Sequence, residues 1–194
     1  METGFSLALS FILGGILLVS ILSFNSNISQ TAILNNMDLS AQTKLQGMVE
    51  IVKNDLRKVG YRIDPEQSDE IISNEEDRIV FRTDIDTARD NRDPGKIELF
   101  QNDSVLVRNV FDESTGMKVD SESVSIGGLR EFNIGYYTSD GDSLQESGED
   151  ASDIRSFKVT IVSGLHYTYD PGDKPPYKPK AYWQSEIYPK NIAR

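Results

Sequence analysis

The longest apolar run of the chain lies at its N-terminal end. Residues 5–24 read FSLALSFILGGILLVSILSF, without a single charged side chain. A helix of this length spans about 30 Å, the thickness of the hydrocarbon core of a bilayer. The preceding METG contains no lysine or arginine, and the run exceeds the usual apolar core of a secretory signal. We therefore predict a retained transmembrane helix over residues 5–24, with a cleaved signal and a buried core helix as the weaker alternatives.

A second helical pattern follows without a break. Residues 25–60 contain no proline, and Gly60 suits the position just past a helix C-terminus. Spacings of three and four place apolar residues on one face of a helix. The stripe comprises Leu45, Met48, Val49, Val52, Leu56 and Val59, extended more loosely upstream by Ile28, Ala32, Met37 and Ala41. We expect one continuous helix to about residue 59, whose amphipathic half, 25–60, packs on a globular domain.

After residue 60 the period of apolar positions changes from 3.6 to 2. Residues 61–194 therefore form a β-rich globular domain in our prediction, with an antiparallel sheet that covers the helix stripe. The fold class is α+β. Expected strands occupy 78–83, 96–101, 104–110, 119–124, 129–137, 155–163 and 181–187, with loops over 64–77, 88–95, 139–153 and 170–180 and a tight hairpin at Asn102-Asp103.

Charge is distributed unevenly along the chain. The formal net charge is −11, but residues 1–61 sum to zero, residues 62–153 carry 24 acidic and nine basic side chains, and residues 154–194 sum to +4. This balance argues against an electrostatic grip on nucleic acid. Cysteine is absent, which excludes disulfides and thiolate metal sites, and His166 is the sole histidine. No catalytic motif is present, so we predict that the chain is not an enzyme.

One acidic segment is the only candidate for an ion site. Asp140, Asp142 and Glu146 concentrate carboxylates between residues 139 and 153. Calcium takes six to eight oxygen ligands, and the spacing lacks the central glycine of an EF-hand loop. We predict a solvated acidic loop and no cofactor, with calcium as the minor alternative.

Several short motifs, in order along the chain, resemble the type IV pilin-like proteins. The closest resemblance is to the J-type minor pseudopilins of type II secretion and to similar minor pilins. Gly4-Phe5-Ser6-Leu7 resembles the junction that the prepilin peptidase cleaves and methylates. The other matching segments are 55–61 (DLRKVGY), 97–99 with 106–108, 129–137 (LREFNIGYY) and 188–191 (YPKN).

This resemblance implies a structural subunit that assembles through its N-terminal helix into a pilus-like or secretion filament. Its implied partners are membrane lipid, other pilin-like subunits, the prepilin peptidase and the assembly platform. The implied location is the bacterial inner membrane, crossed once, with the domain in the periplasm or on an extracellular filament. Residues 1–4 would be the leader, Gly4 and Phe5 the processing site, and Leu9, Gly14 and Gly15 helix contacts.

Two positions depart from the pilin pattern. Leu9 stands where pilins carry a glutamate at the fifth mature position, and such an absence implies a tip, initiating or otherwise specialised subunit. The leader-like segment has Glu2 and no basic residue, which leaves an uncleaved relative open. The functional alternative is a monomeric, membrane-anchored extracytoplasmic binding or sensor domain.

Overall fold

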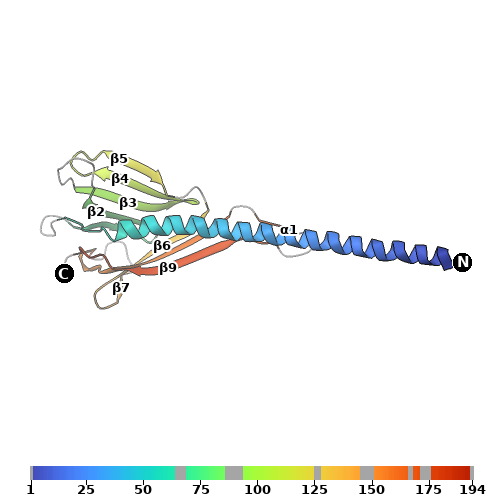
Figure 1. The fold of residues 1–194 in the computed structure, drawn as a ribbon. Coiled ribbons are helices and arrows are strands. Elements are labelled where there is room, and N and C mark those ends of the chain that lie inside the picture. Colours follow the sequence, from blue (N-terminus) through green and yellow to red (C-terminus); the bar gives the residue numbers. More distant parts are fainter. Residues whose placement is uncertain are drawn as a thin grey trace.

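A long helix and two antiparallel sheets make up the structure, a computed structural model that describes residues 2–63, 69–85, 94–124, 128–144, 151–165, 168–170 and 176–192 (Figure 1). The fold class predicted from the sequence is confirmed. The helix is α1 (Glu2–Leu56), and a short 3-10 turn covers Ala151–Asp153. The strands are β1 (Ile71–Asn74), β2 (Arg78–Asp84), β3 (Pro94–Asn102), β4 (Val105–Asp112), β5 (Lys118–Ser123), β6 (Leu129–Tyr137), β7 (Ser143–Leu144), β8 (Ser156–Gly164) and β9 (Lys180–Ile187).

The strands divide over two sheets rather than the one sheet expected. The first has the order β1-β2-β3-β4-β5 and the second the order β7-β6-β8-β9. The division falls where β6 begins beside the β3–β4 turn, with the Leu129 amide donating to the Ser104 carbonyl at 2.9 Å. From there β6 pairs with β8, antiparallel, instead of continuing the first sheet.

Two short strands lie in segments that were predicted to be loops. β1 pairs with β2 through a register shift between Ile71 and Ser73, and β7 contributes only two residues beside Tyr136 and Tyr137. Neither segment shows the alternation of apolar and polar residues on which the strand prediction depends. Tertiary pairing, not local pattern, forms these two strands.

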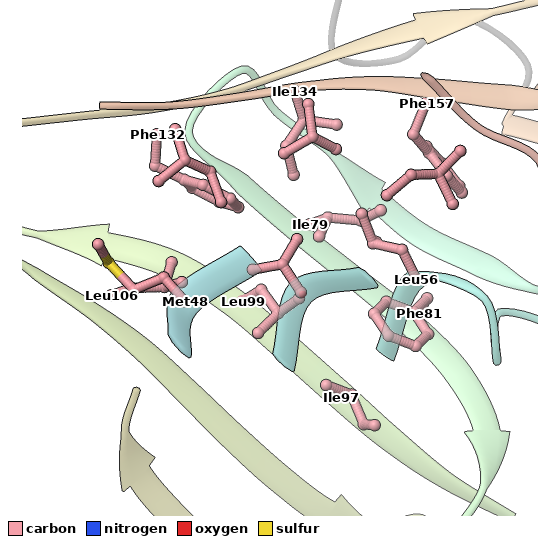
Figure 2. Packing of buried hydrophobic residues seen from close by; sticks show 14 of the residues in the cluster. Met48, Leu56, Ile79, Phe81, Ile97, Leu99, Leu106, Phe132, Ile134 and Phe157 are labelled. Carbon is pink, nitrogen blue, oxygen red and sulfur yellow. The ribbon is translucent and has the colours of Figure 1, made fainter. Parts of the chain in front are cut away.

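The second half of α1 shares one core with both sheets. Met48, Val52 and Leu56 are fully buried, as the stripe predicted. Figure 2 shows Met48 and Leu56 among side chains of the first sheet and of the second, the labelled ones being Ile79, Phe81, Ile97, Leu99, Leu106, Phe132, Ile134 and Phe157. The looser upstream stripe is only partly used: Met37 and Ala41 are buried, whereas Ile28 remains 51% exposed because the domain begins further along the helix.

The helix ends at Leu56, three residues before the predicted end. Gly60 then takes a positive φ of 70°, and its amide donates to the Arg82 carbonyl of β2 at 3.0 Å. The Tyr61 carbonyl accepts from Asp84 on the same strand. These bonds draw the chain off the helix axis and onto β2, which fixes where α1 stops.

Candidate membrane and assembly helix

The N-terminal half of α1 extends beyond the sheets without touching them (Figure 1). Its large apolar side chains are open: Leu9 is 48% exposed and Phe11 74%. The helix is long and apolar enough to cross a membrane, and none of its most apolar stretch is buried inside the structure. Exposed apolar surface on this scale requires a cover of lipid or of other protein.

Two hydroxyl groups on this half of the helix, those of Ser10 and Ser20, are satisfied by the helix itself. Ser10 donates to the Ser6 carbonyl and Ser20 to the Ile16 carbonyl, both at 2.9 Å. Such bonds to the residue four positions back remove the cost of placing a hydroxyl in hydrocarbon. The two serines therefore do not oppose insertion of the segment.

Gly14 and Gly15 sit in the middle of this apolar segment. A Cβ atom added at either position would meet nothing within 4 Å. A glycine inside a helix costs about 1 kcal/mol relative to alanine, and no contact with the described residues explains that cost. Small residues let the backbones of two membrane helices approach closely, so the open space around both glycines is compatible with the predicted helix contact, which stays a prediction.

Two polar contacts tie α1 to the domain. Asp55 receives two hydrogen bonds from the Arg108 guanidinium of β4, at 2.6 and 3.3 Å. Nearer the projecting half, Tyr177 donates its hydroxyl to Asp38 at 2.5 Å. That hydrogen bond raises the pKa of the Tyr177 hydroxyl above its ordinary value. Neither contact can be predicted from the sequence, because the partners lie far apart along the chain.

The acidic candidate site is only partly described. Asp140 and Asp142 are exposed on the turn between β6 and β7, on either side of Gly141, whose φ is 86°. Glu146 and His166 lie outside the described residues. Among the residues that the structure describes, no three histidine or carboxylate side chains gather closely enough to hold a metal ion. Calcium binding therefore stays an untested alternative.

Comparison with known proteins bears on the fold. No protein-family model matches the chain, and no curated protein matches it in sequence. Among solved structures it is similar to a type IV-like pilin from Thermus thermophilus, with a TM-score of 0.58 and 13% identity over 78% of this chain and 98% of that chain. The chain has a type IV pilin-like fold. At this identity the likeness concerns the fold alone, and it does not distinguish a J-type pseudopilin from other pilin-like proteins.

In this pilin-like chain the residues predicted for processing and assembly all lie on the projecting half of α1. Gly4, Phe5 and Leu9 lie in the first turns of α1, and Gly14 and Gly15 follow on the same projecting half. α1 already begins at Glu2, so the helix runs through the Gly4–Phe5 junction without a break. The structure thus brings these residues together on one element, away from the sheets, while their roles in processing and helix contact stay predictions.

Proposed function

We propose that the chain is a membrane-anchored structural subunit, without a reaction of its own, that assembles with like subunits through α1. One observation carries this proposal: a single helix is exposed and apolar in one half and forms part of the domain core in the other. An anchor of this kind would pack laterally against sister helices through apolar and small side chains.

The finer assignments follow from the resemblance in the sequence. The projecting half would span the bacterial inner membrane once, and the sheets would face the periplasm or an extracellular filament. Cleavage after Gly4 by the prepilin peptidase would leave a methylated Phe5 at the N-terminus. Leu9, in place of the pilin glutamate, supports a specialised or minor subunit of a pilus or type II secretion system rather than the main filament subunit.

Processing is tested by the N-terminal mass of the chain isolated from membranes. A chain that begins at N-methylated Phe5 supports a processed pilin. An intact Met1 would overturn the processing step and leave a permanently bitopic relative of pilins.

Assembly is tested separately, by crosslinking between helices. The chain has no cysteine, so the single variant L13C reports on α1 alone. Assembly through α1 predicts crosslinked dimers of L13C in membranes and none of the matched variant K118C, which places the cysteine on β5. An L13C variant that stays monomeric would favour the solitary binding or sensor domain instead.

A further inference from the structure

A basic groove lies where α1 ends, at the side of the domain far from the N-terminus. Lys53, Arg57 and Tyr61 line one side of it, and Tyr188 and Lys190 of the C-terminal segment line the other. Its volume is about 610 Å³. Three cations around one hollow are unexpected in a chain whose net charge is −11.

Lys53, Arg57 and Lys190 have no ion-pair partner within 4.0 Å among the described residues. The arginines of the first sheet behave differently: Arg82, for example, pairs with Glu113 at 2.7 Å. The positive charge of the groove is therefore available to a partner.

One carboxylate, Glu186, also lines the groove. It accepts a hydrogen bond from the Ser156 hydroxyl of β8 at 2.9 Å. Its single negative charge faces the three positive charges of Lys53, Arg57 and Lys190. The groove keeps an excess of positive charge, flanked by two tyrosine rings.

The carboxylates that fit this charge are present on the chain itself. Asp140 and Asp142 are exposed on the β6–β7 turn and form no ion pair in the described part of the chain. Gly141 between them lines a neighbouring hollow that shares Ser185 and Glu186 with the groove, so the turn and the groove lie at the same end of the domain as the end of α1 (Figure 1). Subunits whose helices pack in parallel bring features of similar height together.

We infer that the groove of one copy binds the Asp140–Asp142 turn of a second copy of this chain. The inference rests on the proposed function, because parallel packing of α1 supplies the alignment. The contact joins two different surfaces, so it is heterologous rather than two-fold symmetric, and a single pair of copies is enough to form it. Exposed ion pairs contribute little energy each and are screened by salt, so the contact orients neighbouring domains while the helices supply most of the affinity.

Mixed crosslinking of the full chain in membranes tests the contact. One tagged population carries S139C, beside the turn, and a differently tagged population carries Y188C, in the groove. We expect a mixed dimer between the two tags at low ionic strength, and a loss of that dimer when chloride is raised to molar concentration.

Charge-reversal variants test whether the Asp140–Asp142 turn is the segment that binds in the groove. Adding K53E/R57E/K190E to the Y188C population should lower the yield of mixed dimer about tenfold. Adding D140K/D142K to the S139C population should then restore it, because the charges are exchanged. The matched control K118E/K178E/K180E changes the net charge equally at exposed lysines elsewhere and should leave the yield unchanged.

The outcomes separate this inference from the proposed function. Helix crosslinks of L13C without any mixed dimer would overturn the groove contact and leave assembly through α1 standing, whereas loss of both would overturn both. Failure of the exchanged charges to restore the dimer would overturn the β6–β7 turn as occupant and indicate another acidic surface. Loss of the dimer in inorganic phosphate, but not in chloride of equal ionic strength, would show a small-anion site and equally overturn the inference.

Discussion

Asp55 at the end of α1 and Arg108 of β4 form a two-point ion pair across the core, although 53 positions separate them along the chain. The Asp55 side chain is 6% exposed and the Arg108 side chain 18%, so the pair is partly shielded from water. D55A leaves the guanidinium without its main partner and should lower the free energy of unfolding by about 2 kcal/mol. Denaturant unfolding of the full chain in detergent measures this change.

A second carboxylate near Arg108 provides the control for D55A. Asp120 lies 4.0 Å from Arg108 and its side chain is 58% exposed. D120N should change the stability by less than about 0.5 kcal/mol. Equal losses for D55A and D120N would show that burial does not decide the strength of these pairs.

The two faces of α1 should respond differently to truncation. Met48 is fully buried in the shared core, whereas Leu39 is 62% exposed. M48A should destabilise the domain by about 2–5 kcal/mol, because it leaves a cavity that the sheets fill only in part. L39A should stay within about 0.5 kcal/mol of the natural chain in the same unfolding experiment. A large loss for L39A would show that the exposed face is covered in the isolated chain.

Both the backbone conformation at position 60 and the atoms around it require a glycine. The φ of Gly60 is 70°, and a Cβ atom there would stand 2.8 Å from the Asn191 carbonyl oxygen. Gly116 has a similar φ of 66° with open space around it. G116A should therefore cost about 1 kcal/mol from the backbone alone, and G60A clearly more. Thermal unfolding of both variants checks the order, and equal costs would dismiss the contact with the C-terminal segment.

A charge in the projecting half should oppose membrane insertion. Ile16 lies within residues 5–24, whereas Ile33 lies beyond them on the same helix. A lysine at the centre of a membrane helix costs about 3 kcal/mol on insertion scales. I16K should move much of the chain from the membrane to the soluble fraction, and I33K should not. Equal partitioning of both variants would contradict a span over residues 5–24.

Tyr177 gives a prediction about pH. Its hydrogen bond to Asp38 raises the pKa of the hydroxyl above 10.0 in the folded chain. A folded-state pKa that is raised contributes stability that is complete below the unfolded value and is lost as the pH rises through the folded value. The stability difference between the natural chain and Y177F should therefore be constant from neutral pH to about pH 9 and shrink above pH 10. A difference that stays constant above pH 10 would show that the hydrogen bond is not formed in solution.

The sequence predicts those structural features that depend on residues close together in the chain. The stripe through Met48, Val52 and Leu56 is visible because a helix repeats its faces every few residues. The tight hairpin between β3 and β4 was also expected, although its turn residues are Asp103 and Ser104, one position later than predicted, since Asn102 still pairs with Val105.

Features that depend on contacts between distant segments could not be predicted from the sequence. The break between the two sheets depends on β6 choosing β8 over the first sheet, and no periodicity encodes that choice. For the same reason, the pairing of Asp55 with Arg108 could not be read from either segment. Lys53 and Arg57 suit a helix C-terminus by their charge alone, and the groove is not visible in the sequence because Lys190, which completes it with them, lies more than 130 positions away.

α1 transmits force as well as position. It runs from Glu2 to Leu56 without a proline, and its second half lies alongside β9 (Figure 1). A pull on the N-terminal end is therefore delivered along the helix axis to Met48, Val52 and Leu56, which would have to slide past the strands. Contacts loaded in this direction resist together, whereas a sideways pull separates them one after another. The fold thus bears tension best along the axis of its anchor.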